Sequence, residues 1–404
     1  MDTPDSTAIA ELRLRPREDA RLRAGHLWIY SNEVDTRATP LKSFEPGQPV
    51  RILAASGRPL GTGYVNPHSL ICARLVSRDP ARVLDRSLLV HRLKVALSLR
   101  RRLFGAPCYR LVHGEGDGLP GLVVDRYGEV VVAQILTAGM ERVRVAVVEA
   151  LERVLGPAVV VLRGDSPVRE LEGLERYVET VLGEAPEALQ VVENGIDFEA
   201  PLAGGQKTGW FYDHRLNRAR LARYCRDARV LDVFSYVGAW GVQAAVAGAR
   251  QVLCVDGSRS ALEWVERNAR RNRVGERVSV RRGDAFEVLR ELREARERFD
   301  VVILDPPAFI KRRKDAARGL AAYRRINELA LRLLDRDGFL LSASCSFHLE
   351  RSALQRQVLA AGRHLDRELA LLEQGHQGPD HPVHPAIPET DYLKALLFRA
   401  LPAH

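Results

Sequence analysis

One stretch of the sequence, residues 229–241, constrains the fold more than any other. It reads Arg-Val-Leu-Asp-Val-Phe-Ser-Tyr-Val-Gly-Ala-Trp-Gly. The run Val230–Val233 is apolar and β-branched, as in a buried strand, and Ala239–Ala247 has the composition of a helix. A strand, a glycine turn and a helix in this order form the first unit of a doubly wound sheet, whose ligands bind at the carboxyl ends of the strands. Gly238 and Gly241 would let a ligand approach the backbone closely.

The spacing of these glycines differs from the G-x-G-x-x-G fingerprint of dinucleotide-binding sheets, which disfavours a nicotinamide cofactor. Strand-like and helix-like segments alternate from residue 228 onward. This alternation predicts an α/β domain with a parallel sheet of about seven strands. The strands are expected at Val230–Val233, Gln251–Val255, Val278–Arg281, Phe299–Leu304, Phe339–Ala343, Leu369–Leu372 and Leu393–Leu397.

Acidic residues recur at the ends of the first four of these strands. Asp232 and Asp256 end the first two, Asp284 follows the third, and Asp305 follows the fourth. An acid after the second strand suits the two hydroxyls of a ribose. An acid after the third can accept a hydrogen bond from an exocyclic amine such as that of adenine. A single aspartate in such a place is often a helix cap, but four in register favour a ligand site at one edge of the sheet.

The chain before this domain divides into two parts. Residues 1–79 hold several short strands separated by turns, which predicts a small β-barrel. Residues 80–190 combine an amphipathic helix, glycine-rich turns and strands, which predicts a middle α+β domain. Asn194-Gly195 marks a β-hairpin at the start of the last part, because both residues accept positive φ angles.

The net charge of +9 is carried largely by arginine. A polyanionic partner would explain it, since the planar guanidinium matches phosphate. Arginine-rich codon usage without a functional cause explains it equally well, so composition leaves both interpretations open. Arginines gather in the first part, at Arg13, Arg15, Arg17, Arg21 and Arg23.

The five cysteines, at positions 72, 108, 225, 254 and 345, are odd in number and form no C-x-x-C pair. Neither a zinc site nor a disulfide framework is predicted, and we expect no metal. A reducing, cytoplasmic location fits this usage best. We also expect no signal peptide and no membrane-spanning segment.

Several motifs resemble known families. Gly25-His-Leu-Trp-Ile-Tyr-Ser-Asn-Glu-Val and Gly63-Tyr-Val-Asn-Pro-His-Ser-Leu resemble the PUA domain of RNA-modifying enzymes. The acidic series resembles the class I S-adenosylmethionine-dependent methyltransferases. Asp305-Pro-Pro-Ala-Phe resembles their fourth motif, which holds the target base. Ser342-Ala-Ser-Cys-Ser-Phe-His resembles the motif that carries the nucleophile of 5-methylcytosine enzymes.

Two further motifs, Gln206-Lys-Thr-Gly-Trp-Phe-Tyr-Asp-His-Arg and Asp380-His-Pro-Val with Tyr392-Leu-Lys, are similar to one subgroup. These are the bacterial PUA-containing 23S ribosomal RNA cytosine-5 methyltransferases. The resemblance implies a PUA-like β-barrel over residues 1–79, an α+β domain over 80–190, and a Rossmann-like seven-stranded methyltransferase domain over 191–404. It implies S-adenosylmethionine as cofactor and RNA, specifically 23S ribosomal RNA, as partner, with no membrane. It leaves the oligomeric state open, a homodimer being one alternative.

The resemblance also implies which residues form the site. Cys345 would add to carbon 6 of the cytosine, and Asp305 would stabilise the charge that develops on the ring. The residues expected to bind the cofactor are Thr208, Phe211, Asp213, Arg215, Asp232, Phe234, Gly238, Asp256, Ser258, Asp284, Ala285 and Asp305. Those expected to bind the base are Pro306, Pro307, Phe309 and Lys311.

Three positions depart from the family pattern. Pro307 stands where many RNA cytosine-5 enzymes have a second cysteine, so the base that removes the carbon 5 proton stays unassigned. His214 stands where the subgroup has Gln, and Arg324 where it has Lys. Neither of these two changes removes a required chemical group.

Alternatives remain for several residues. Cys345 is either the nucleophile or an inert thiol of the core. The basic run 311–314 either holds phosphates or forms a solvated helix face. The aromatic run 210–212 favours a ligand lid over packing against the next helix. Asp117 and Asp125 are either catalytic carboxylates or turn residues.

Two other functions also fit the sequence. An amino-group methyltransferase of RNA or DNA would use Asp305-Pro-Pro-Ala-Phe to hold an exocyclic amine and would need no thiol. A non-catalytic RNA-binding or ribosome assembly factor would keep the fold without the reaction, although the intact acidic series argues against it.

Overall fold

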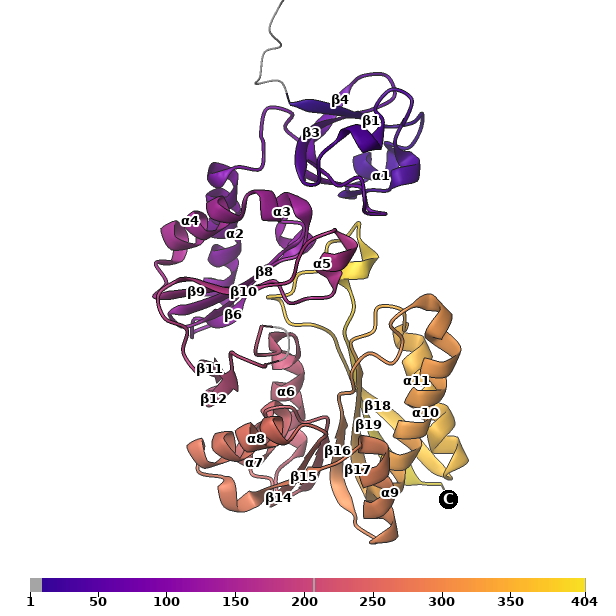
Figure 1. Cartoon of the computed structure of the whole chain (residues 1–404). Coiled ribbons are helices and arrows are strands. Elements are labelled where there is room, and N and C mark those ends of the chain that lie inside the picture. The colour runs from indigo at the N-terminus through magenta and orange to yellow at the C-terminus, as the bar shows by residue number, and fades with distance from the viewer. Residues whose placement is uncertain (1–8, 206–207, 404) are drawn as a thin grey trace, which may run out of the picture. The chain divides into compact units, whose positions relative to one another are not determined.

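The computed structural model describes residues 9–205 and 208–403, which form two compact units (Figure 1). The first unit contains the described residues up to 187, together with the segments around 205–210 and 379–390. The second contains 188–204, 211–378 and the described residues from 391 onward. The chain therefore passes between the units several times, and loops of the later part are built into the first unit.

The first unit begins with a five-stranded sheet in the order β1-β3-β4-β5-β2. Its strands are β1 (Ala10–Arg13), β2 (Trp28–Ile29), β3 (Gln48–Leu53), β4 (Pro59–Val65) and β5 (Ala73–Ser77), with the short helix α1 (Ala20–Arg23). The apolar side chains of alternate strand positions, among them Leu12, Ile29, Val50 and Ile52, are fully buried and form its core.

A second sheet in this unit has the order β10-β9-β8-β7-β6. Its strands are β6 (Cys108–His113), β7 (Leu122–Tyr127), β8 (Val130–Ile135), β9 (Val159–Arg163) and β10 (Val178–Leu182). Its helices are α2 (Arg86–Leu103), α3 (Ala138–Arg142), α4 (Arg144–Leu155) and α5 (Val168–Leu171). Asp85 caps α2 by accepting from the Leu88 amide at 2.8 Å. Short 3-10 turns occur in both units, at Ser31–Glu33, Leu41–Ser43, Gly114–Asp117, Tyr212–His214, Ala222–Tyr224, Gly275–Arg277, Arg313–Asp315 and Pro388–Thr390.

Asp117 and Asp125, the two candidate carboxylates of this region, are partners in buried ion pairs. Both carboxylate oxygens of Asp117 accept from Arg100, at 2.6 and 2.7 Å, and both of Asp125 accept from Arg110 at 2.8 Å. Asp125 is fully buried, and the Asp117 side chain is 6% exposed. These contacts make both residues structural, so a catalytic role for either is wrong.

The second unit opens with the predicted hairpin, formed by β11 (Ala188–Glu193) and β12 (Ile196–Pro201). Asn194 and Gly195 have φ angles of 55° and 78°, as a two-residue turn between twisted strands requires.

A seven-stranded sheet follows in the order β15-β14-β13-β16-β17-β19-β18. Its strands are β13 (Arg229–Val233), β14 (Gln251–Asp256), β15 (Val278–Arg282), β16 (Phe299–Leu304), β17 (Leu334–Ser344), β18 (Arg367–Gly375) and β19 (Lys394–Pro402). The predicted set of strands is present. The expectation of a parallel sheet is wrong for β19, which runs antiparallel to both neighbours. An antiparallel strand needs no helical crossover, and the segment joining β18 to β19 holds only a 3-10 turn.

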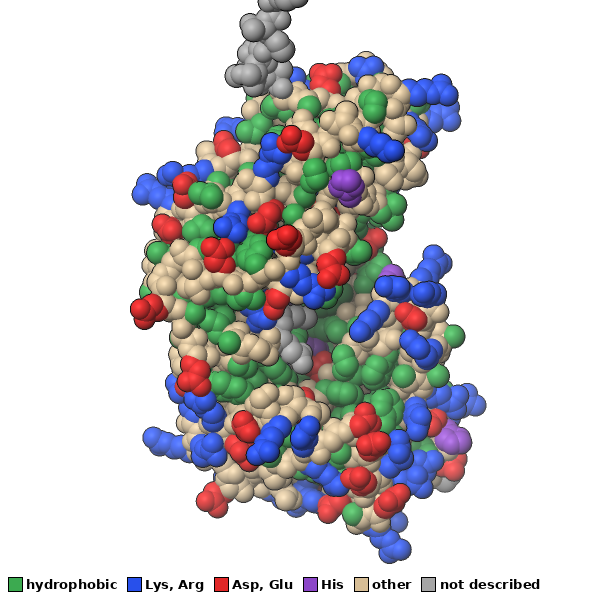
Figure 2. Space-filling view, viewed as in Figure 1, with side chains coloured by type: hydrophobic (Ala, Val, Ile, Leu, Met, Phe, Trp, Pro, Cys, Tyr) green, Lys and Arg blue, Asp and Glu red, His purple; other side chains and the backbone are tan. Residues whose placement is uncertain are grey.

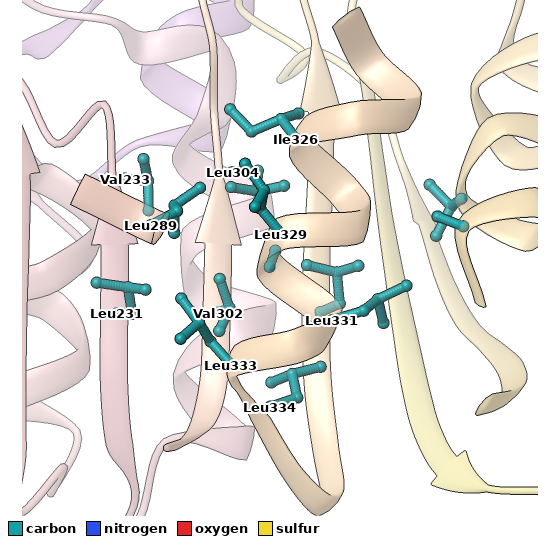
Figure 3. Close-up of a cluster of buried hydrophobic side chains, with 14 of the residues drawn as sticks. Leu231, Val233, Leu289, Val302, Leu304, Ile326, Leu329, Leu331, Leu333 and Leu334 are labelled. Carbon is teal, nitrogen blue, oxygen red and sulfur yellow. The ribbon is translucent and has the colours of Figure 1, made fainter. Parts of the chain in front are cut away.

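Helices cover this sheet in two groups (Figure 1). One group is α6 (Arg215–Leu221), α7 (Ala239–Val246) and α8 (Arg259–Arg271), and the other is α9 (Ala285–Glu294), α10 (Ala316–Leu333) and α11 (Arg351–His364). Figure 3 shows Val302 and Leu304 of β16 facing Leu329 and Leu333 of α10. These side chains are at most 8% exposed, and their burial is the main force that holds α10 on the sheet.

Within the residues that the structure describes, no helix combines the length and apolar character needed to cross a membrane.

The Arg100–Asp117 pair gives a test of stability. Asp117→Ala leaves the fully buried Arg100 guanidinium without its carboxylate, which should cost about 3–5 kcal/mol of unfolding free energy. Urea unfolding followed by circular dichroism measures it. Asp337→Ala removes a carboxylate that also contacts an arginine through both oxygens, Arg399, but the pair is exposed and water screens it. That control should leave the midpoint nearly unchanged, and equal effects of the two variants would contradict the assignment.

Candidate active site

The first strand-end acid, Asp232, is fully buried within β13. Its Oδ2 accepts from the Gly241 amide at 2.9 Å. Burial raises the pKa of Asp232 to about 7, although the Gly241 amide works in the opposite direction. Asp232 therefore holds the glycine turn against β13 through the Gly241 amide.

The next two acids, Asp256 and Asp284, accept hydrogen bonds from nearby backbone amides and are at least partly exposed to solvent. Asp256 ends β14, is half-buried, and accepts from the amides of Tyr236 (2.9 Å) and Ser258 (2.8 Å). Ser258 caps α8, since its hydroxyl accepts from the Ala261 amide. Asp284 caps α9, whose first residue is Ala285, and remains exposed to solvent. Both carboxylates can therefore serve a ligand at this edge while they hold the local backbone.

The turn after β13 is strained. Phe234 and Tyr236 have φ angles of 67° and 50°, which are unfavourable for residues with a β-carbon, and Gly238 has 86°. The Phe234 amide donates to the Val255 carbonyl oxygen at 2.9 Å, and Asp256 binds the Tyr236 amide. Strain of this kind persists where the surroundings hold it in place, and it is common at ligand sites.

The fourth acid, Asp305, directly follows β16 and keeps 21% of its side chain exposed. Its Oδ2 accepts from Trp240 Nε1 at 3.0 Å, and its Oδ1 lies 3.2 Å from His214 Nε2. Burial alone would raise the pKa of Asp305, but His214 and Trp240 outweigh it, and the pKa lies below its usual value. Asp305 is thus an ionised carboxylate held by two ring nitrogens.

The residues after Asp305 differ in their exposure and contacts. Pro306 is buried, Pro307 is exposed, and Phe309 is half-buried with its ring 4.8 Å from that of Tyr323 and 6.2 Å from that of Phe286. Lys311 begins an exposed basic run that ends at 314. Figure 2 shows several Lys and Arg side chains on the surface over this end of the α10–α11 layer.

Cys345 directly follows β17 and is partly exposed, whereas the other four cysteines are buried. Burial raises the pKa of Cys72 and Cys225 to about 12 and that of Cys254 well above its usual value. The strands β16 and β17 are parallel neighbours with Leu304 opposite Ser342, so Asp305 and Cys345 lie at the same edge of the sheet. Cys345 is therefore the accessible thiol of the five.

The other predicted cofactor residues are divided between the two units. Thr208 belongs to the first, where its hydroxyl donates to Asp125. Phe211, Asp213 and Arg215 belong to the second. The Phe211 ring packs edge-on against Tyr236. Asp213 and Arg215 are buried, and Asp213 accepts from the Tyr392 hydroxyl at 2.8 Å.

The aromatic run at 210–212 forms no joint lid. Trp210 is 1% exposed and Tyr212 is fully buried, so only Phe211 has a ring that a ligand could reach. The lid hypothesis is therefore wrong for Trp210 and Tyr212, whose rings pack inside their units. Gln206 and Lys207 of the same motif lie outside the described residues.

Sequence reasoning assigned no role to Trp240, included Lys394 only within the Tyr392-Leu-Lys motif, and noted His214 only as a departure from a pattern. Trp240 and His214 contact Asp305, and Lys394 contacts Ser346, the residue after Cys345. Trp240 could have been found from its place in the glycine turn, next to Gly241. Residues 9–205 and 208–403 contain no cluster of His, Cys, Asp and Glu that could hold a metal ion.

Two family descriptions match the sequence. Residues 12–78 match the PUA-like domain, and residues 110–399 match the S-adenosylmethionine-dependent methyltransferases. Among curated relatives, the ribosomal RNA large subunit methyltransferase I of Tolumonas auensis is 37% identical over 394 residues, which cover 96% of this chain and 98% of the relative. The enzyme of the same description from Klebsiella pneumoniae (strain 342) is 36% identical, over 95% of this chain and 96% of the relative.

Solved structures agree in fold. A Streptococcus mutans chain described as a methyltransferase dependent on S-adenosylmethionine has a TM-score of 0.81 and 21% identity, over 96% of this chain and 100% of that chain. A chain described as a methyltransferase and solved with S-adenosylhomocysteine has a TM-score of 0.82 with the same identity and coverage. The fold class predicted from the sequence is confirmed.

The buried acid Asp232 predicts a pH dependence of stability. The folded protein keeps this carboxyl protonated up to about pH 7, whereas an unfolded chain releases the proton near pH 4. The contribution of Asp232 to stability should therefore fall as pH rises from about 4 to about 7. Asp232→Asn, which keeps an acceptor for Gly241, lacks this loss. The thermal midpoint of Asp232→Asn minus that of the wild type should therefore increase across this interval. Above it, the difference should stay constant.

The control is Asp335→Asn, which replaces an exposed acid in the same unit. Its midpoint should follow that of the wild type at every pH. A difference between Asp232→Asn and wild type that does not change with pH would contradict the burial of an ionisable Asp232.

Proposed function

Since the chain belongs to the S-adenosylmethionine-dependent methyltransferase family and carries a PUA-like domain before it, we propose that it methylates carbon 5 of a cytosine in 23S ribosomal RNA through Cys345. S-adenosylmethionine is the cofactor, as expected from the sequence. The large-subunit ribosomal RNA named for the relatives supports the choice of substrate.

One observation carries the cytosine-5 assignment: a partly exposed thiol, Cys345, and an ionised carboxylate, Asp305, end adjacent parallel strands. Carbon 5 of cytosine is too weak a nucleophile to take a methyl group unaided. The Cys345 thiolate adds to carbon 6 and makes carbon 5 enamine-like. S-adenosylmethionine, when bound, would supply the methyl group that carbon 5 takes, and its sulfonium–methyl bond would break to leave S-adenosylhomocysteine. Loss of the carbon 5 proton to a base expels the thiolate and restores the ring.

Asp305 supports this addition by accepting from the exocyclic amine of the base. As a carboxylate it can accept a hydrogen bond but has no proton to give to ring nitrogen N3. We therefore assign Asp305 a hydrogen bond from the exocyclic amine. It can also accept one from N3, but only after that ring nitrogen has gained a proton. His214 and Trp240 keep the carboxylate ionised and fix its direction, so its charge is in place before the base arrives.

The donor set at the sheet edge fits S-adenosylmethionine. Asp256 would hold the ribose hydroxyls, and Asp284 with Ala285 would hold the adenine. Phe234, Gly238 and Ser258 line the same turns. Pro306, Pro307, Phe309 and Lys311 would contact the target base or its phosphate.

RNA binding draws on the whole chain. The net charge of +9, the arginines of the first domain and the exposed basic run at 311–314 are all suited to phosphates. The absence of paired cysteines among positions 72, 108, 225, 254 and 345 supports a reducing, cytoplasmic location.

The placement of the ribose is tested by Asp256→Ala. The ribose hydroxyls would lose a charged acceptor, so affinity for S-adenosylmethionine should fall by about 1–3 kcal/mol, measured by titration calorimetry. Asp337→Ala, an exposed acid at the opposite end of β17 from Cys345, should bind as the wild type does. Unchanged affinity of Asp256→Ala would reject this placement.

The reaction class is tested at Cys345. Cys345→Ala should abolish methyl transfer and still bind S-adenosylmethionine. RNA that contains 5-fluorocytosine should form a covalent adduct with the wild type, since fluorine cannot leave as a proton does and the thiol stays attached. Cys345→Ala should form none, whereas Cys225→Ala should still form it. Denaturing gels with labelled RNA distinguish these outcomes.

A second candidate function, methylation of an exocyclic amine, is favoured by one observation: an ionised Asp305 in Asp305-Pro-Pro-Ala-Phe is a suitable acceptor for such an amine. That reaction needs no thiol. Full methylation activity in Cys345→Ala would therefore move the enzyme to this class.

A further inference from the structure

Lys394 is the first residue of β19, and from this neighbouring strand it contacts the residues on both sides of Cys345. In the register of β17 and β19, Lys394 lies opposite Ser344, the residue before Cys345. Its Nζ donates at 2.8 Å to the carbonyl oxygen of Ser346, the residue after Cys345. A second bond, to the Tyr392 carbonyl oxygen, is 3.0 Å long. The ammonium group is thus fixed beside the loop that carries the thiol.

This cation is buried, since Lys394 is only 5% exposed. Among the residues that the structure describes, no carboxylate lies within ion-pair distance of its Nζ; its two recorded acceptors are neutral carbonyl oxygens. Burial lowers the pKa of Lys394 to about 8, while the charges of Asp391 and Cys345 oppose that shift. A buried ammonium is costly unless an anion offsets it, and Cys345 as a thiolate is an anion in its field.

We propose that Lys394 is a positioning residue that stabilises Cys345 as a thiolate, which is the form that attacks carbon 6 in the function proposed above. The thiol proton leaves to solvent, and Lys394 keeps its three protons and forms no covalent bond. When the thiolate adds to the base, its negative charge moves onto the ring and the ammonium group remains in place.

Three other ionisable groups near this loop, in the described part of the chain, are Tyr323, Arg351 and Asp391. Tyr323 on α10 bonds to the Ser344 hydroxyl at 2.7 Å, and burial raises its pKa to about 12, so it is neutral. Arg351 on α11 is directed to the Gly375 carbonyl oxygen at 2.7 Å and acts on Lys394 by lowering its pKa. Asp391 is an anion and opposes a thiolate.

The direction of the pH effect follows from these groups. Lys394 carries its charge below about pH 8 and loses it as pH rises through that value. An ordinary thiol ionises near pH 8.5, so the help from Lys394 should be greatest below pH 8.

The experiment measures alkylation of Cys345 by iodoacetamide in the full chain between pH 5.5 and 9.5, followed by mass spectrometry of the Cys345 peptide. Cys345→Ala supplies the blank, and the other four thiols are buried. For the wild type, the rate should reach half its maximum below the pH of about 8.5 that marks an ordinary thiol. A wild-type midpoint at or above that value would overturn the proposal without any variant.

Lys394→Gln should move the midpoint upward by about one pH unit or more and slow alkylation at pH 7 by about tenfold. Lys394→Arg, which keeps the charge, should retain most of the wild-type behaviour. Lys94→Gln removes an exposed lysine of α2 and should change nothing. An unchanged midpoint in a folded Lys394→Gln protein, or the same shift in Lys394→Arg, would overturn the proposal.

Trapping with 5-fluorocytosine RNA separates this inference from the proposed function. Lys394→Gln should form the adduct about tenfold more slowly than the wild type at pH 7 and approach it near pH 9. If wild-type Cys345 is alkylated with a midpoint below about pH 8.5 but forms no adduct, the role of Lys394 stands and the cytosine-5 reaction is rejected. If the wild type forms the adduct but its Cys345 alkylation midpoint is that of an ordinary thiol, only the role of Lys394 is rejected.

Discussion

The hydrogen-bonded register between β16 and β17 is the constraint on which the candidate active site depends. The strands run parallel with Leu304 opposite Ser342, so both chains leave the sheet at one edge, where Asp305 and Cys345 follow. A slip of one residue would turn every side chain of a strand to the other face. The buried contact between β16 and α10 in Figure 3 prevents that slip, because Val302 and Leu304 must face the helix.

Burial alone does not decide which acids at this edge keep a charge. Asp232 and Asp305 stand on neighbouring strands, and desolvation raises the pKa of each. For Asp232, burial outweighs the Gly241 amide and the positive charge of Arg218, so its pKa rises to about 7. Asp305 has His214 and Trp240, which more than offset the burial. One acid therefore holds the turn, and the other keeps its negative charge.

The local patterns predicted most of this fold. Alternation of apolar runs located the strands of the large sheet, and Asn194-Gly195 located the hairpin. What these patterns did not predict depended on contacts distant in sequence. Thr208 donates to Asp125, which is 83 positions away, and Trp210 is buried in a unit built mainly from residues before 188. No local periodicity encodes such contacts, so the burial that rules out a lid role for Trp210 could not be read from its neighbours in the sequence.

The direction of β19 explains why the strand-end pattern assigned no role to Lys394. Parallel strands present only their carboxyl-terminal residues at the edge where Asp305 and Cys345 lie, so a search of strand ends finds acids and the thiol. An antiparallel strand presents its first residue there, and β19 begins at Lys394, opposite Ser344. The reversed strand thereby adds to the edge a cation that a wholly parallel sheet would have placed at the far end. The same departure from parallel order that the sequence failed to predict thus supplies the group that we infer to hold the nucleophile in its reactive form.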